Sequence, residues 1–146
     1  MFTETLSIKG KLHIALFNED GGMKEERFLE NLVTTAGKTA IASRLDGTTT
    51  AVMSHMAVGT GTTAANIADT TLVTEIDRNA LDSSTPSTNT EIYVCTWAAG
   101  DGTGALTEAG VLNASSSGTL LCRTVFSVIN KGASDSLVIT WTITIS

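Results

Sequence analysis

The stretch SLVITWTITIS at residues 136–146 has the clearest pattern in the chain. Large apolar residues occupy every second position, and valine or threonine fills the positions between them. The apolar set is Leu137, Ile139, Trp141, Ile143 and Ile145. Successive side chains of a β-strand point to opposite faces, so a period of two predicts a strand with one buried face.

The same alternation is found near the other end of the chain. The apolar residues that share one parity there are Leu6, Ile8, Leu12, Ile14 and Leu16. A turn-forming run, NEDGG at 18–22, separates this segment from a second strand expected at 23–28. We therefore expect residues 1–30 to form an N-terminal β-hairpin, or an arm that reaches a neighbouring subunit.

The segments between the two ends are also predominantly strand-like. Five further strands are expected, at 52–58, 72–78, 91–98, 106–113 and 119–129, with 58–71 and 83–89 as loops. One helix is expected at 32–45, capped by Thr34 or Thr35 and stopped near Gly47. About eight strands and no βαβ alternation predict an all-β fold. We expect residues 31–146 to form one antiparallel two-sheet β-sandwich, jelly-roll-like, with one short helix.

Composition excludes several classes of protein. The 146 residues are 42% hydrophobic and 16% charged, with 25 threonines and a net charge of −6. This is too apolar for a disordered chain and too acidic for a protein that binds nucleic acid through a basic face. No apolar run is long enough to span a bilayer, and the opening MFTETLSIKG does not resemble a signal peptide. We expect neither nucleic acid nor membrane as a partner.

Residues with catalytic or metal-binding chemistry are few. Cys95 and Cys122 lie in apolar strands, so buried thiols are expected rather than a disulfide or a metal site. His13 and His55 have no further ligand at metal-binding spacing. The run Gly59-Thr60-Gly61 lacks the lysine of a phosphate loop, so we expect these glycines to serve tight backbone geometry.

Two carboxylates could have either a catalytic or a structural role. A pair such as Glu75 and Glu108 is the chemistry that hydrolyses a glycosidic bond. With seven aromatic residues in the chain, the sequence does not indicate a saccharide cleft. The structural alternative is that Glu75 or Asp77 pairs with Arg78 or Arg123 at a subunit contact. We favour the structural alternative, and we expect no enzyme activity, no catalytic residue, no cofactor and no metal.

Three segments in this order resemble a family of small virion proteins of tailed bacteriophages. They are NLVTTAGKTAIASRL at 31–45, MAVGTGTTAANIADTTLVTEIDR at 56–78, and 106–143, which opens with LTEAG and ends with ITWTI. Members of the family are capsid cement (decoration) proteins or tail-fibre-associated structural proteins. The resemblance implies a jelly-roll-like sandwich that oligomerises, as a dimer or trimer, on the outside of the virion.

In the cement role, such a protein clamps neighbouring major capsid subunits without catalysis. The positions that match the family's segments are expected to be fold or interface residues. They are Gly59, Gly61, Leu72, Glu75, Arg78, Glu108, Gly110 and Trp141. An adaptor at a tail fibre or baseplate is the alternative function. A small hydrolase or carbohydrate-binding module is a third class, and only the sandwich fold supports it.

Overall fold

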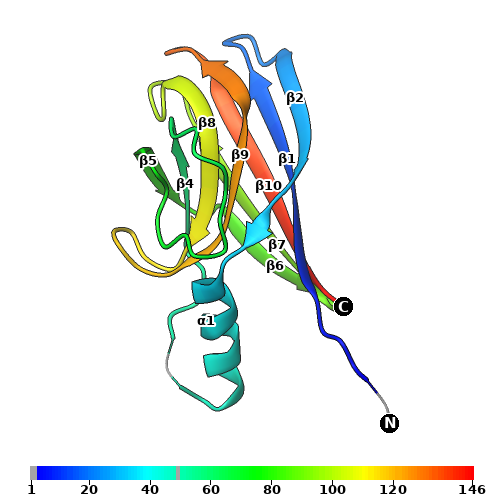
Figure 1. The fold of residues 1–146 in the computed structure, drawn as a ribbon. Helices are drawn as coiled ribbons and strands as arrows, with labels where there is room; N and C mark the ends of the chain where they lie inside the picture. The colour runs from blue at the N-terminus through cyan, green and yellow to red at the C-terminus, as the bar shows by residue number, and fades with distance from the viewer. Residues whose placement is uncertain (1–2, 49) are drawn as a thin grey trace.

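Two five-stranded antiparallel sheets pack face to face in the computed structural model, which describes residues 3–48 and 50–146 (Figure 1). The first sheet has the order β2 (Met23–Glu30), β1 (Ile8–Phe17), β10 (Ser136–Ile145), β7 (Thr90–Trp97) and β6 (Ser83–Ser87). The second has the order β3 (Leu32–Val33), β9 (Leu120–Lys131), β8 (Gly104–Leu112), β4 (His55–Gly59) and β5 (Glu75–Ala80). The expected all-β two-sheet sandwich with one short helix is confirmed.

Most connections either join neighbouring strands of one sheet or cross from one sheet to the other. Neighbouring strands of one sheet are joined at β1–β2, β4–β5, β6–β7 and β8–β9. The chain crosses between the sheets at β2–β3, β5–β6, β7–β8 and β9–β10. Helix α1 (Thr35–Leu45) lies between β3 and β4 in the chain and projects from one end of the sandwich (Figure 1).

The first and last strands form the centre of the first sheet. All ten residues of β1 pair with β10, in a register that places Leu12 opposite Trp141 and Ile14 opposite Ile139. These four side chains are at most 2% exposed and lie in the main hydrophobic core. The N-terminal hairpin is therefore an integral part of the sandwich. Residues 8–30 pack with the rest of the chain and do not form a separate arm.

The described part of the chain contains ten strands rather than about eight. One addition is β3, a two-residue strand that pairs with β9 within the segment expected to start the helix. The other is β6, which contains Pro86 and was expected to be a loop. Proline has no amide hydrogen, but an edge strand leaves one side of its backbone unpaired and therefore tolerates it.

Helix α1 begins at Thr35, three residues later than the expected range, directly after one of the two predicted caps. Thr34 is the N-cap, and its hydroxyl accepts a hydrogen bond from the amide of Gly37 at 2.9 Å. Gly47, with a φ of 81°, follows the last turn. Gly37 is buried against β9, because a Cβ built on it would lie 2.4 Å from the carbonyl oxygen of Leu121. The helix therefore lies closer to β9 than it could if residue 37 had a side chain.

The close approach at Gly37 reverses the usual effect of a helical Gly-to-Ala change. In an open helix, alanine is favoured by about 1 kcal/mol. We expect Gly37→Ala to lower the free energy of unfolding by about 1–3 kcal/mol, because the helix must move away from a backbone atom. Chemical denaturation measures the change, and Thr39→Ala on the exposed side of the helix is the control. A more stable Gly37→Ala variant would contradict this packing.

The two cysteines are buried free thiols, as expected. Cys95 and Cys122 are both 0% exposed. Burial raises the pKa of Cys95 to about 12 and raises that of Cys122 as well. Both thiols are therefore protonated at neutral pH, and both pack as small apolar side chains of the core.

Candidate functional site

The outer face of the second sheet is covered by the loop at residues 60–74, which connects β4 to β5. Leu72 of this loop is 5% exposed and packs with Ala57, Leu112 and Leu120 in a second, smaller hydrophobic cluster. Gly110 leaves the space for it, because a Cβ there would lie 2.7 Å from Leu72 Cδ1. The loop thus has a core of its own on the face of the sheet that points away from the main core.

A single buried carboxylate holds the loop to the sheet. Glu108 on β8 is 0% exposed. Its Oε1 accepts hydrogen bonds from the amides of Gly61 (3.0 Å) and Thr74 (2.6 Å). Its Oε2 accepts from the amide of Val73 (2.9 Å) and from Arg123 Nε (3.0 Å). The carboxylate therefore binds both ends of the loop and accepts hydrogen bonds from three of its backbone amides.

Arg123 on β9 completes the network from the neighbouring strand. Its guanidinium contacts Glu108 Oε2 (2.9 Å) and Asp69 Oδ2 (2.9 Å), and it donates to the carbonyl of Thr63 (2.9 Å). The side chain is 1% exposed. In the β8–β9 register, Arg123 is opposite Gly110, two positions from Glu108 on the same face. One guanidinium thus joins the sheet to the middle of the loop.

The hydrogen bonds to Glu108 outweigh the cost of its burial. Burial alone would raise the pKa of this carboxyl. The amides of Thr74, Val73 and Gly61, together with the Arg123 guanidinium, instead hold its pKa below the ordinary value of 4.5. Glu108 is therefore ionised at neutral pH and forms a buried ion pair with Arg123.

The lowered pKa of Glu108 makes stability depend on pH. The ionised carboxylate stabilises the fold fully above pH 4.5, and this contribution is lost as the pH falls through the lower value of the folded state. We expect the free energy of unfolding to decrease on acidification below about pH 4.5. Asp135, whose pKa is also lowered, contributes to the same fall.

The variant Glu108→Gln shows how much of this pH dependence comes from Glu108. The variant is expected to be less stable than the wild type at neutral pH, and the difference should shrink as the pH falls, because the wild-type side chain then becomes neutral too. Urea unfolding at several pH values measures this difference. A difference that is constant from pH 7 to about pH 3 would contradict the assigned ionisation.

The two glycines of the VGTGTT run serve close backbone approach, as predicted. A Cβ on Gly59 would lie 2.3 Å from the carbonyl oxygen of Thr74, and one on Gly61 would lie 2.5 Å from Glu108 Oε1. Any larger residue would displace the loop or the carboxylate. The amide of Gly61 already donates to Glu108 and is not free to bind a phosphate.

Five of the eight residues selected from the sequence contact the loop or the Glu108 carboxylate, namely Gly59, Gly61, Leu72, Glu108 and Gly110. Two more, Glu75 and Arg78, lie beside the loop on β5. Glu75 forms an ion pair with Arg78 (2.7 Å), whose Nη1 also donates to the carbonyls of Ala114 and Ser117. The pairing of Glu75 with Arg78 was one of those expected. It was expected at a subunit contact, whereas here both residues belong to the same chain. The eighth residue, Trp141, lies in the main core and takes no part in the network.

The sequence prediction missed the central pairing of the site. Arg123 was considered a partner of Glu75 or Asp77, and Asp69 was not selected. The available indication was the position of Arg123 within the otherwise apolar strand segment at 119–129. A buried arginine requires a buried or half-buried acid. Glu108 supplies it, and a side chain so enclosed cannot contact a saccharide, which leaves the glycosidase pair without support.

The other candidate ligands have protein partners. His13 Nε2 lies 2.8 Å from Glu26 Oε1, and His55 Nδ1 lies 2.8 Å from Ser54 Oγ. Among residues 3–48 and 50–146, no group of three or more His, Cys, Asp or Glu side chains is arranged to hold a metal ion. The one helix of the described chain is too short to cross a bilayer.

Comparisons of the chain with protein-family models, with curated proteins and with solved structures gave no significant match.

Proposed function

We propose that this chain is a structural virion protein that binds the outside of a tailed-phage capsid and cements neighbouring major capsid subunits. The supporting observation is the nature of the loop at 60–74. Its sequence, TGTTAANIADTTLVT, contains one charged residue, Asp69, and Arg123 neutralises that charge. The loop therefore presents small polar and apolar side chains without a free charge. Interface centres are depleted of charged residues in the same way.

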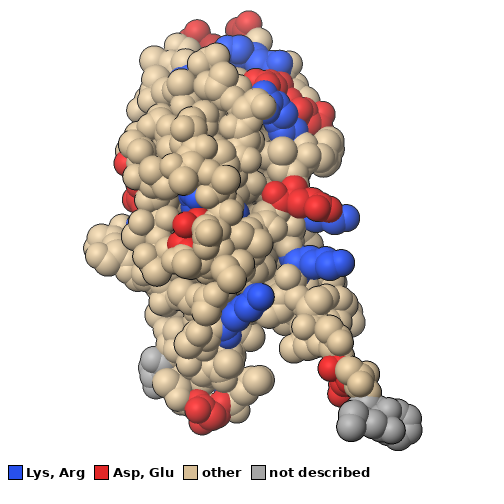
Figure 2. Space-filling view, in the orientation of Figure 1, with Lys and Arg blue, Asp and Glu red and all other residues tan. Residues whose placement is uncertain are grey.

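The rigidity of the loop supports the same proposal. Glu108 and Arg123 fix its ends and its middle, so little conformational entropy is lost when a partner binds. Ile67, Val73 and Ile76, on the loop and on β5, are between 41% and 54% exposed. Figure 2 shows that charged side chains gather over β1 and β2, whereas the surface over the second sheet is largely uncharged. The part of this surface that the loop and β5 form is suited to cover a neighbouring protein.

The proposed cementing role requires binding only and no catalysed reaction. Each copy bridges two capsid subunits, and many modest contacts on one lattice give high avidity. We propose that the chain assembles as a dimer or trimer, as oligomers at symmetry axes do. The proposed contact surface is on the second sheet, whereas the N-terminal hairpin belongs to the first sheet, where β1 pairs with β10.

A pair of matched variants tests the loop as the contact surface. Ile67→Asp places a charge on the loop, and Val128→Asp places the same charge on β9 at a similarly exposed position (54% and 45%). Both should fold, because neither side chain is buried. We expect Ile67→Asp to weaken binding to expanded, undecorated capsids by at least about tenfold and Val128→Asp to bind like the wild type. Equal binding by both variants would contradict the assignment of the surface.

A further inference from the structure

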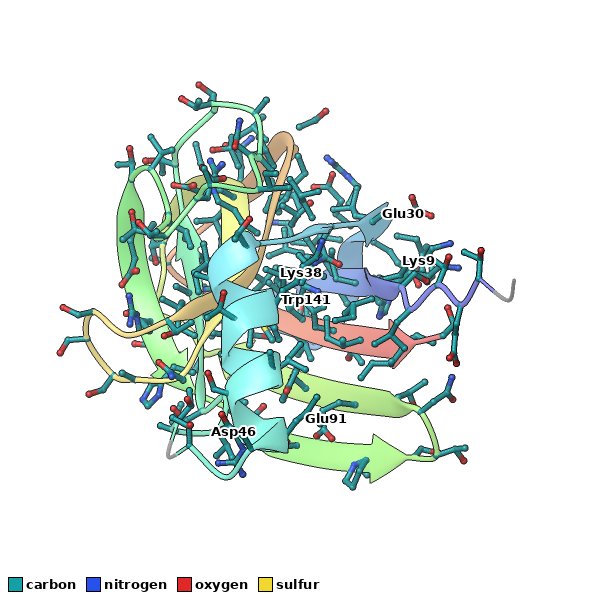
Figure 3. All side chains as sticks on the ribbon, turned by 60° about the horizontal axis from the view of Figure 1, so that its bottom comes forward. Lys9, Glu30, Lys38, Asp46, Glu91 and Trp141 are labelled. Atoms are coloured by element: carbon teal, nitrogen blue, oxygen red, sulfur yellow. The ribbon has the colours of Figure 1, made fainter. Side chains whose placement is uncertain are left out.

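Three of the nine lysine and arginine side chains form no ion pair or hydrogen bond with the rest of the described chain. The other six, Lys24, Arg27, Arg44, Arg78, Arg123 and Lys131, each contact a carboxylate or a carbonyl. The three free cations are Lys9, Lys11 and Lys38, and all of them line one pocket of about 270 Å³. Figure 3 labels Lys9 and Lys38 on their elements.

The fold creates this cluster from two elements. Lys9 and Lys11 are two positions apart on β1 and therefore point to the same face of the first sheet. Lys38 comes from the first turns of α1. Glu30 is the acidic residue among the lining side chains, so the pocket has a formal charge of +2 in a chain of net charge −6. Unpaired like charges that share a pocket repel one another, and an anion relieves that repulsion.

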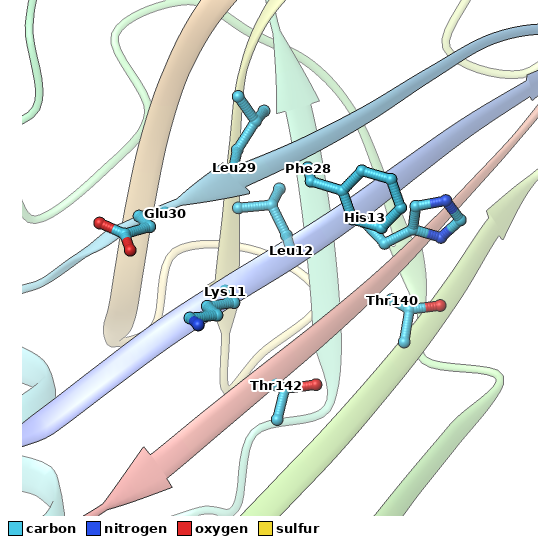
Figure 4. A pocket seen from close by; sticks show the side chains of 8 residues that line it. All are labelled: Lys11, Leu12, His13, Phe28, Leu29, Glu30, Thr140 and Thr142. Atoms are coloured by element: carbon cyan, nitrogen blue, oxygen red, sulfur yellow. The ribbon is translucent and has the colours of Figure 1, made fainter.

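A second hollow lies along the outer face of the first sheet. This hollow, about 420 Å³, shares Lys11 and Glu30 with the first and extends to Phe28 and His13 (Figure 4). Phe28 is 76% exposed, and its ring stacks on that of His13 with centroids 4.7 Å apart. The groove thus has cations at one end and an exposed aromatic ring at the other. An inorganic anion would use only the first of these features.

We propose that this groove binds an acidic segment of a partner protein. Carboxylates of the segment contact Lys9, Lys11 and Lys38, and an apolar side chain packs against Phe28. The occupant follows from charge complementarity and from the position of Lys11, which lines both hollows. The proposal rests on these side chains alone and does not depend on the virion role.

The test is an NMR titration of the whole chain with a synthetic peptide that has four glutamates around one phenylalanine. We expect salt-sensitive chemical-shift changes that cluster at Lys9, Lys11 and Lys38 and extend to Phe28. Replacing all three lysines with alanine should weaken binding about tenfold, which is the effect expected of several exposed ion pairs. No clustered shifts at low salt would overturn the proposal.

Two controls separate this site from general electrostatics. The triple change Ser83→Glu, Thr85→Glu and Ser87→Glu alters the net charge by the same amount on the exposed edge strand β6. It should leave binding within about threefold of the wild type, and equal weakening would overturn the proposal. A glutamate peptide without phenylalanine should bind more weakly. If that peptide and inorganic tripolyphosphate bind as tightly, the site takes small anions and the assigned partner is wrong.

Discussion

Replacing Glu108 with alanine is expected to lower the free energy of unfolding by about 3–5 kcal/mol, the cost of leaving a buried charge without its partner. Arg123 would keep only Asp69 as a counter-ion, and the amides of Gly61, Val73 and Thr74 would lose their acceptor. Urea denaturation followed by circular dichroism measures the change. The loop at 60–74 should also become accessible to proteases, since both of its ends are released.

Glu75→Ala is the matched control for this experiment. Glu75 also pairs with an arginine, but its side chain is 31% exposed. The Arg78 side chain is only 8% exposed, but it keeps the carbonyls of Ala114 and Ser117 as partners. Since the acid itself is partly exposed, this variant should lose clearly less stability than the Glu108 variant. Similar losses for the Glu75 and Glu108 variants would mean that burial of Glu108 does not decide its contribution.

The second large effect is expected at Trp141. This side chain is 0% exposed and lies on β10, in the centre of the first sheet. Trp141→Ala removes the largest type of side chain from the main core, and such changes lower the free energy of unfolding by about 3–5 kcal/mol. Chemical denaturation of the variant measures the loss.

Trp141→Phe separates packing from hydrogen bonding at this position. The indole Nε1 has no hydrogen-bond partner among the described residues, so the phenylalanine variant loses volume but no hydrogen bond. We expect it to lose about 1–2 kcal/mol, less than half the effect of alanine. Equal losses for the two variants would show that the indole N–H has a partner.

The fold was predictable from sequence wherever a pattern is local. The alternation at 137–145 and in the N-terminal segment predicted β10 and β1, and the capping chemistry of Thr34 predicted the start of α1. The strand β6 was missed because edge strands can be polar on both faces and can contain proline. The two-residue β3 has too few residues to show any period.

The site was predictable only in part, because its central contacts are long-range. Gly59, Gly61 and Gly110 were selected as structural positions, and each lies where a Cβ would be too close to another atom. The partnership of Glu108 with Arg123 depends on the register of β8 and β9 and on the folding of the loop over them. No local spacing in the sequence encodes either, so neither the burial of Arg123 nor its pairing with Glu108 was predicted.

The proposed role as a capsid cement protein is tested most directly by counting copies in co-sedimentation. Purified protein is mixed with expanded, undecorated capsids of a phage that encodes it and, in parallel, with isolated tails. We expect saturable binding to capsids at hundreds of copies per particle, the number that a contact repeated over the whole shell requires. Binding to tails alone, or at about a dozen copies per particle, would contradict it and assign the chain to the tail instead.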